Sequence, residues 1–462
     1  MDIMKLYKIL LLSSAVLLSG CKNYLSVQPQ GKVIPETDEE FAALIHNRIN
    51  SIEGGEDEYI IGNYDGIILY ESFSDNLDAN VKIGSIAAYA GDKINSRQLT
   101  YKNTFSVIRD CNIVLENMAG RDTELARKLM SASYAIKGIC YYNLIRNYCE
   151  AYSPTDAASQ LGLPLIDKFD MEAMPAREPL NVTVEYAADL MKKSMAYHIT
   201  DGMFLFTENV VKAYLAKLYF WVGDYDSMIP LCEELMAVKE YKLASIGEYE
   251  SMIQAKNAQG QEVIVRSHIN NSCDLDWYYS MIIKDLRTRP VNATLVHLFD
   301  EDKEKDVRYA VSFDSKRLNM KNSSAKVRGS EIVLMLAEAY AQTGNEAAAL
   351  EQLNYLRRNR IEGVTDYTMD TLPEVDTTAL IKEDSQGKPL TRLMTAIFNE
   401  RRKELYLEAD RWFELKRNGC PEMWVINNGL KYTTKRYLYT APIYKGDTDL
   451  NDKMIQNEGY VS

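Results

Sequence analysis

Apolar residues recur at helical spacing along most of the chain. Three acidic residues after Thr37 precede an apolar stripe, which predicts a helix that begins at about residue 38. The same spacing predicts helices over residues 101–118 and 123–148. Residues 50–95 are rich in Gly, Asp, Asn and Tyr, which predicts loops with short helices. The pattern therefore predicts a mainly α-helical protein.

Two stretches of the chain share one helix-turn-helix pattern. One reads KAYLAKLYFWVGDYDSMIPLCEELM from Lys212, and the other reads IVLMLAEAYAQTGNEAAALEQLNYLRRNR from Ile332. Four residue types keep the same offsets, 121 residues apart (336 − 215 = 121), at Leu215, Ala216, Tyr219 and Gly223 and at Leu336, Ala337, Tyr340 and Gly344. The glycine would end the first helix in a left-handed turn, and the alanine would let the second helix approach closely. The pattern resembles a tetratricopeptide repeat.

Two further helical segments, from Ser131 and from Thr395 to Gly419, extend the set without showing all of the offsets. Repeat units need neighbours that cover their apolar faces, so about four helix pairs in one array are expected. We place these pairs near residues 101–150, 183–240, 328–360 and 395–419. The predicted architecture is a superhelical scaffold of tetratricopeptide-like helix pairs with minor β structure, and with long inserted regions at about 50–100, 241–327 and 362–390.

The N-terminus has the pattern of an export signal. Lys5 and Lys8 precede a largely apolar run over residues 9–18, and small residues lead to Cys21. The run is shorter than the roughly 20 residues that a retained membrane helix needs. Cys21 after Ser-Gly resembles the bacterial lipobox, in which the thiol is acylated and anchors the mature protein. The alternative is an ordinary secreted protein with a chance cysteine.

These features divide the chain into residues 1–20 as a lipoprotein signal peptide and residues 21–37 as a lipidated tether. Pro29, Gly31 and Pro35 oppose a helix in the tether. Residues 38–462 then form a single domain. Beyond the signal, no apolar run approaches the length of a membrane span.

Composition excludes several classes of function. The net charge of −13 disfavours a nucleic-acid partner, because phosphate binding needs a basic surface. No histidine has the spacing of a metal ligand, and no P-loop, GxSxG or HExxH pattern is present, so we predict no metal, cofactor or catalytic residue. The six cysteines besides Cys21 are sparse and lack a CxxC pair, which favours mostly free thiols over the disulfides that export would permit.

Several motifs together carry a family resemblance. They are CKNYLSVQPQG from Cys21, SDN at 74–76, RGSEIVLMLAEAYAQTGN from Arg328, NERRKELYLEADRWFELKRNG from Asn399, API at 441–443 and QNEGY at 456–460. With them the chain resembles the SusD/RagB family of outer-membrane nutrient-binding lipoproteins of Bacteroidetes. Glu414 stands where that family usually has aspartate, and Tyr444 stands where it has a second proline.

The resemblance implies a SusD-like fold and a non-enzymatic function. The protein would be anchored by lipid to the outer membrane and would face the cell surface. It would bind a nutrient oligomer, either an oligosaccharide or a peptide, and deliver it to a SusC-like TonB-dependent outer-membrane transporter.

Charged residues on the last predicted helix have a structural interpretation. Glu400, Arg401, Glu404, Glu408 and Arg411 fall at i, i+4 and neighbouring spacings. Such pairs stabilise a helix by a few tenths of a kcal/mol each. In a repeat array these side chains would tie one helix to its neighbour. Carboxylates one turn apart also occur in acid–base catalysis, which leaves a surface glycan hydrolase as a distant alternative.

A sugar site would use aromatic rings with polar neighbours, since the flat ring packs on the apolar face of a sugar. The first candidates are Trp277, Tyr278 and Tyr279 in the inserted region after Asn271, and the second is Trp424, near a loop after Pro421. The early loops add Tyr59, Tyr70, Asp75 and Asn76. The aromatic residues could instead hold long loops on the helical body. Trp221 and Trp412 lie in helical repeats and are predicted core residues.

Two observations leave the ligand open. Members of the family that bind starch use tryptophan in the early loop region, and this chain has none between residues 22 and 220. Starch-like binding is therefore disfavoured, while other glycans and peptides remain. A helical-repeat scaffold that organises an outer-membrane complex without a small ligand is the alternative function.

Overall fold

The structure is a computed structural model, and it describes residues 35–81, 89–170, 172–255, 260–267, 286, 289–322 and 325–461. The chain divides into two units, residues 1–41 and residues 42–462. The helix predicted to begin after Thr37 is present as α2 (Asp38–Glu53). Within the described ranges the second unit is mainly helical, which confirms the predicted fold class.

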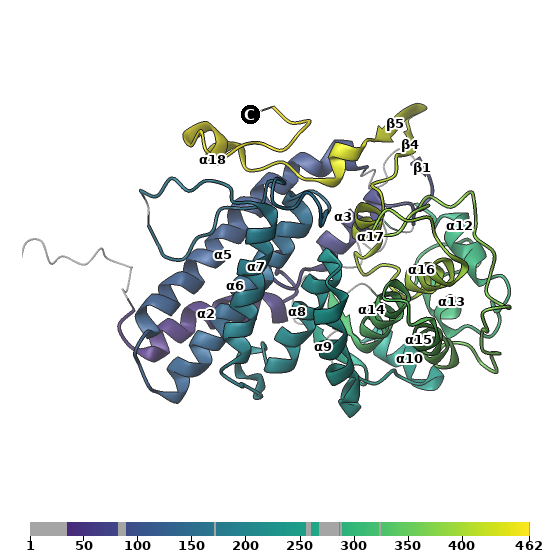
Figure 1. The fold of residues 1–462 in the computed structure, drawn as a ribbon, viewed down its shortest axis with the longest axis horizontal. Helices are drawn as coiled ribbons and strands as arrows, with labels where there is room; N and C mark the ends of the chain where they lie inside the picture. Colours follow the sequence, from purple (N-terminus) through teal and green to yellow (C-terminus); the bar gives the residue numbers. More distant parts are fainter. Residues whose placement is uncertain are drawn as a thin grey trace, which may run out of the picture. The chain divides into compact units, whose positions relative to one another are not determined.

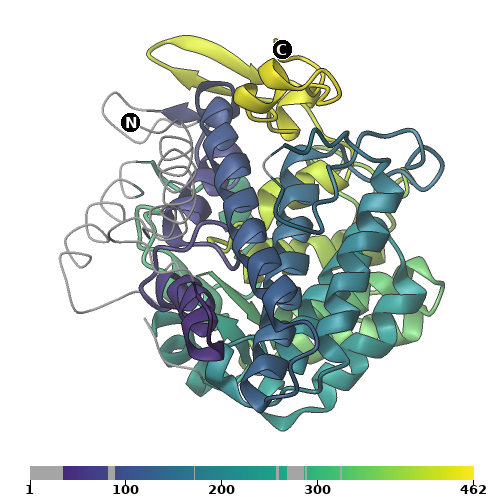
Figure 2. The same cartoon turned by 90° about the vertical axis from the view of Figure 1, so that its left-hand side faces the viewer.

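Successive long helices of the second unit pack side by side in chain order, as Figures 1 and 2 show. They are α5 (Arg97–Met118), α6 (Glu124–Tyr148), α7 (Leu180–Met195), α8 (Glu208–Val222) and α9 (Tyr225–Ala237). α14 (Gly329–Gln342) continues the array, because it packs on α9 although 91 residues separate the two helices (329 − 237 − 1 = 91). It also packs on α15 (Glu346–Arg358) and α16 (Arg392–Glu404).

The two predicted repeats are the pairs α8–α9 and α14–α15. Gly223 and Gly344 adopt left-handed backbone conformations at the predicted turns, with φ of 75° and 83°. Met228 and Ala349, at matching places on the second helix of each pair, are fully buried. The shared spacing in the sequence therefore reflects a structural repeat. The turn between the two helices of each pair requires glycine, and the place where the helices cross requires a side chain that fits between them.

The segment from Thr395 to Gly419 is two helices separated by a break. α16 ends at Glu404 and α17 (Arg411–Arg417) begins seven residues later (411 − 404 = 7). Leu407 and Ala409 both have a φ of 60°, a conformation that no α-helix accommodates. The predicted i, i+4 pairs along one continuous helix are therefore wrong, and Glu408 lies in the connecting loop.

The carboxylates of this segment bind arginines from other elements instead. We call Glu262, Arg308, Arg328, Arg360 and Glu404 the Glu404 cluster, and the side chains of all five are fully buried. Glu404 lies 2.5 Å from Arg328, 3.0 Å from Arg360 and 3.3 Å from Arg308. Glu262 lies 2.7 Å from Arg328 and 2.8 Å from Arg360. The prediction that these charges tie neighbouring elements together is confirmed.

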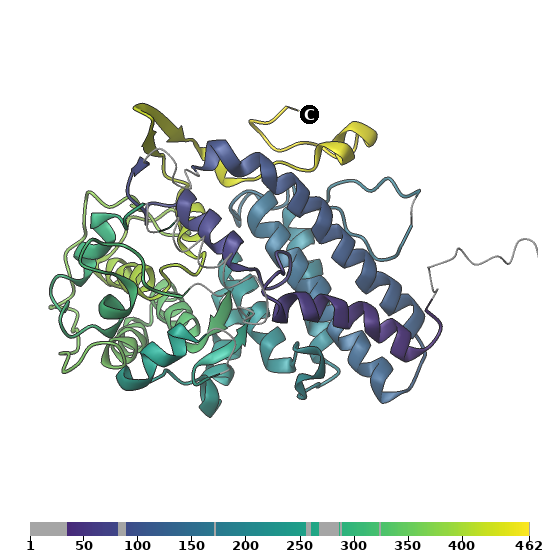
Figure 3. The same ribbon diagram turned by 180° about the vertical axis from the view of Figure 1, so that it is seen from behind.

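Short elements fill the inserted regions. Two antiparallel strands, β2 (Val263–Arg266) and β3 (Lys326–Arg328), pair beside the array. β4 (Met423–Asn427) pairs with β5 (Leu430–Thr434) and, in parallel, with β1 (Asn80–Val81), which Figure 3 shows beside the C-terminal strands. The remaining α-helices of the described ranges are α3 (Tyr64–Phe73), α4 (Ala90–Lys93), α10 (Ile246–Gln254), α12 (Ala293–Val296), α13 (Val307–Ser312) and α18 (Lys445–Leu450).

The predicted core residues and thiols are where the pattern placed them. Trp221 and Trp412 are 5% and 2% exposed. Of the six cysteines besides Cys21, five fall in the described ranges and are buried free thiols, namely Cys111, Cys140, Cys149, Cys232 and Cys420. None of the helices in those ranges combines the length and apolar character that a membrane span requires. Cys21 and Cys273 lie outside the described residues.

Candidate functional site

A surface groove of about 300 Å³ lies where six distant segments meet, and we call it the Trp424 groove. Its volume is at the lower end of the range of about 300–1,000 Å³ that is typical of small-ligand pockets. The segments are the loop that follows α3, the start of α12, a loop over residues 376–381, and parts of α16, α17 and β4. Polar lining residues are Asp75, Asn292, Thr294, Asp376, Thr378, Thr395, Asn399, Arg402, Arg411 and Glu422.

Trp424 supplies the aromatic surface of this groove. It lies on β4 opposite Thr433, and 47% of its surface is exposed. Val425, the next residue, points to the other side of the strand and is buried. The Lys431 ammonium lies 5.1 Å from the centroid of the Trp424 ring. A large aromatic ring at the rim of a polar groove is the feature that an aromatic sugar platform requires.

Asp75 forms the floor of the groove together with two arginines. One carboxylate oxygen lies 2.7 Å from Arg411 Nε, and the other lies 3.0 Å from Arg411 Nη2 and 3.1 Å from Arg402 Nη2. Burial favours the protonated form of Asp75, but the two guanidiniums outweigh that effect and hold its pKa well below the usual value. Asp75 is therefore an ionised carboxylate that fixes both arginines in place.

Asn76 lies behind this floor and is 1% exposed. Its side-chain oxygen accepts a hydrogen bond from Arg402 Nε at 2.9 Å, and its amide donates to Glu71 Oε2 at 2.9 Å. Burial raises the pKa of Glu71 to about 7. Direct contact between Asn76 and a ligand, as the sequence predicted, does not fit this position, because the side chain points inward and orients Arg402.

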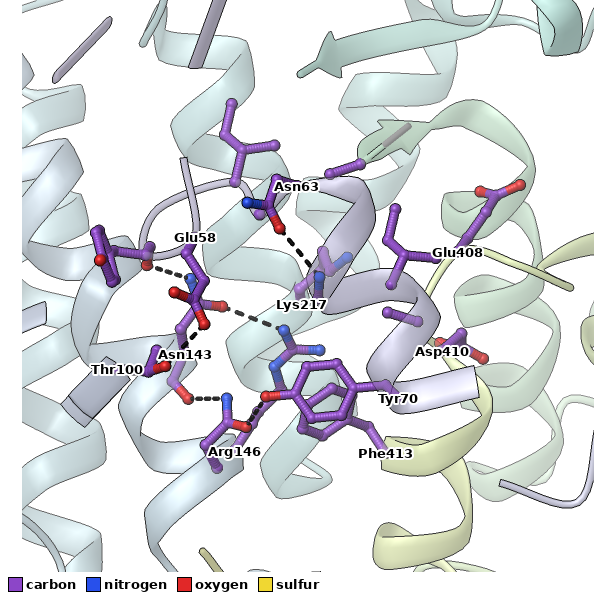
Figure 4. Close-up of a pocket in the computed structure, with 18 of the residues that line it drawn as sticks. Glu58, Asn63, Tyr70, Thr100, Asn143, Arg146, Lys217, Glu408, Asp410 and Phe413 are labelled. Atoms are coloured by element: carbon purple, nitrogen blue, oxygen red, sulfur yellow. Dashed lines mark hydrogen bonds between the residues drawn. The ribbon is translucent and has the colours of Figure 1, made fainter. Parts of the chain in front are cut away.

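Tyr59 and Tyr70 line a different space, an interior chamber of about 110 Å³ that Figure 4 shows. Tyr59 accepts a hydrogen bond from Asn103 at 3.2 Å, and the Tyr70 hydroxyl donates to Asn147. The chamber shares no residue with the Trp424 groove. It is well below the size of a small-ligand pocket, so an oligomer would not fit there. The sequence grouped these tyrosines with Asp75, but the structure separates them.

The structure thus joins Asp75 and Trp424 in one groove. Trp277, Tyr278 and Tyr279 lie outside the described residues and stay predictions. Apart from Asp75, the polar lining residues, Arg402 and Thr294 among them, were missed as site residues by sequence reasoning. For Arg402 a signal was present, because the Glu-Arg-Arg motif offers two adjacent guanidiniums of which only one can point into the helical body.

Comparisons with known proteins agree with this architecture. Residues 305–460 match the SusD family, and this span contains the motifs that begin at Arg328 and Asn399. No curated protein matches the chain by sequence.

Solved structures with a similar fold come from Bacteroides. A SusD superfamily protein from Bacteroides thetaiotaomicron is 18% identical with a TM-score of 0.69, over 91% of this chain and 100% of that one. A SusD superfamily protein from Bacteroides vulgatus is also 18% identical with a TM-score of 0.69, over 93% and 100%. A SusD-like carbohydrate binding protein from Bacteroides vulgatus is 16% identical with a TM-score of 0.66, over 91% and 98%.

Proposed function

The chain belongs to the SusD/RagB family, and from that premise we propose that it binds an oligosaccharide in the Trp424 groove without catalysing a reaction. The observation that carries the proposal is the exposed indole of Trp424 beside ordered polar groups. The name of one protein of the same fold, a SusD-like carbohydrate binding protein, supports the choice of ligand.

The groove offers a sugar two complementary surfaces. The indole of Trp424 can pack on the apolar face of a pyranose ring. Thr294, Thr378 and Asn399 line the same groove, and their hydroxyl and amide groups can exchange hydrogen bonds with sugar hydroxyls. Because Asp75 and Glu414 already hold the Arg411 guanidinium, the floor is preorganised and little ordering is needed on binding.

Replacing Trp424 with alanine is expected to weaken oligosaccharide binding at least tenfold, or about 1.4 kcal/mol. The loss follows because the indole is the largest apolar surface that the groove presents. Isothermal titration calorimetry with a panel of neutral and acidic oligosaccharides and short peptides would measure it. The matched control is Phe169→Ala, since Phe169 is 46% exposed and lines a different surface pocket.

A ligand that binds the wild type, the Phe169 variant and the Trp424 variant with one affinity would contradict the assignment of this groove. In that event Trp277, which lies outside the described residues, becomes the next position to replace. Failure of every oligosaccharide and peptide to bind would favour the scaffold function instead.

The proposal includes a partner and a location. We expect the protein to be acylated on Cys21, to face the cell surface from the outer membrane, and to deliver its ligand to a SusC-like TonB-dependent transporter.

Purification from membranes in mild detergent should recover the transporter with the wild-type protein. The Cys21→Ser variant should lose membrane association. Recovery of the wild-type protein alone, or a Cys21→Ser variant that stays in the membrane fraction, would argue against this part.

A further inference from the structure

A small second cavity lies next to the interior chamber, between α6, α8, α14, α16 and α17. Its volume is about 30 Å³, enough for one or two water-sized occupants, since about 10–15 Å³ already holds a water. It shares Arg146, Lys217 and Asp410 with the walls of the chamber, where Figure 4 shows them. It shares no lining residue with the Trp424 groove, although Glu414 on its wall binds Arg411 of the groove floor.

Three hydrogen-bond donors on the wall of this cavity have no partner among the described residues. They are Trp221 Nε1, Arg401 Nη1 and Arg146 Nε, and all three are buried. These nitrogens can only donate, so a compatible occupant must accept several hydrogen bonds. Leaving buried donors unpaired would cost about 1–3 kcal/mol each.

Among the charged side chains around the cavity, one cation lacks a carboxylate partner within the described residues. The other cations each have a carboxylate partner, in the pairs Lys217–Glu331 at 2.7 Å, Arg401–Asp410 at 2.5 Å, Arg411–Glu414 at 2.7 Å and Arg417–Glu338. Arg146 has no carboxylate partner within the described part of the chain. Its guanidinium donates to the neutral amide oxygen of Asn143 at 3.1 Å and lies 4.2 Å from the centroid of the Phe413 ring.

We propose that this cavity binds one small monatomic anion of the chloride class. An anion can accept hydrogen bonds from Trp221, Arg401 and Arg146 together and offsets the charge of Arg146. A single water accepts at most two hydrogen bonds and leaves that charge uncompensated.

Glu414 places a hydrogen-bond acceptor on the wall of the cavity. Its second carboxylate oxygen, Oε1, has no hydrogen-bond partner in the described ranges. Burial raises the pKa of Glu414, with Asp410 adding to the effect, while Arg411 and Arg401 oppose it. Protonated Glu414 would supply a fourth donor to the anion. Anion binding should therefore strengthen as the pH falls.

Bromide is the direct probe, because it replaces chloride and scatters anomalously. Crystals of the wild-type protein grown in sodium bromide should show an anomalous peak within hydrogen-bond distance of Trp221 Nε1. A water without anomalous signal at that place would overturn the proposal.

Thermal unfolding tests the same site in solution. At constant ionic strength, replacing sodium methanesulfonate by sodium chloride should raise the unfolding temperature of the wild type progressively with chloride concentration. Trp221→Phe removes the donor and keeps an aromatic ring, so its chloride response should be largely lost. Trp412→Phe is the matched control, since Trp412 is 2% exposed, lines neither cavity, and should leave the response intact.

The measured quantity is the rise in unfolding temperature that chloride causes in each protein. A general loss of stability in Trp221→Phe therefore does not affect the comparison. Equal chloride responses in the wild type and the two tryptophan variants would show an unspecific salt effect and would overturn the proposal. If Trp221→Phe does not fold, Arg146→Met provides the second test of the same site.

Discussion

Replacing Glu404 with glutamine is expected to lower the free energy of unfolding by about 3–5 kcal/mol, the usual result of removing one partner from a buried ion pair. Glu404 is fully buried and faces Arg308, Arg328 and Arg360. Glutamine keeps the size of the side chain but removes its charge. The three guanidiniums would then share one carboxylate fewer, with Glu262, Asp306, Glu400 and Glu408 as their remaining counter-charges. Urea unfolding followed by circular dichroism would measure the change.

Glu351→Gln is the matched control for that experiment. Glu351 also pairs with an arginine, Arg358, at 3.0 Å, but 59% of its side chain is exposed. Exposed pairs contribute only about 0–1 kcal/mol, so this variant should unfold close to the wild type. A small effect at both positions would mean that the Glu404 cluster adds no net stability, and that its arginines find other partners.

The repeats were predictable from the sequence because their determinants are local. Gly223 and Gly344 end helices in a conformation that other residues rarely adopt, and the apolar positions follow one helical period. The break after Glu404 was not predictable in the same way. Leu407 and Ala409 are ordinary helix formers, and their left-handed conformations are imposed by what surrounds the loop, where Leu407 N donates to the buried Glu71.

The candidate site likewise combines residues that the sequence reveals with an arrangement that it does not reveal. Asp75 and Trp424 were each recognisable from their surroundings, but 349 residues separate them (424 − 75 = 349). Their meeting depends on the parallel pairing of β1 with β4, in which Asn80 lies opposite Ile426. A two-residue strand such as β1 has no period that a sequence can reveal. Proximity in the groove could therefore be learned only from the structure.

Acid should unfold this protein steeply below about pH 4.5, and the buried carboxylates determine the direction of the effect. Burial opposes ionisation of Glu400, but Arg308, Lys403 and Arg357 outweigh it and lower its pKa to about 2. The same balance lowers the pKa of Glu404 and Glu408. Below their usual value of 4.5 the unfolded chain therefore binds protons that the folded protein does not, so stability is present above that pH and is lost as the pH falls.

Urea unfolding at a series of pH values between 5 and 3 should thus show a free energy of unfolding that decreases with acid. Each such carboxylate contributes up to one proton, or about 1.4 kcal/mol per pH unit. Glu404→Gln removes one of them, so its free energy should depend on pH less steeply by up to that amount. Glu351→Gln should keep the slope of the wild type. The same slope in all three proteins would show that Glu404 releases its proton alike in the folded and unfolded chain, which would contradict the ionised cluster seen here.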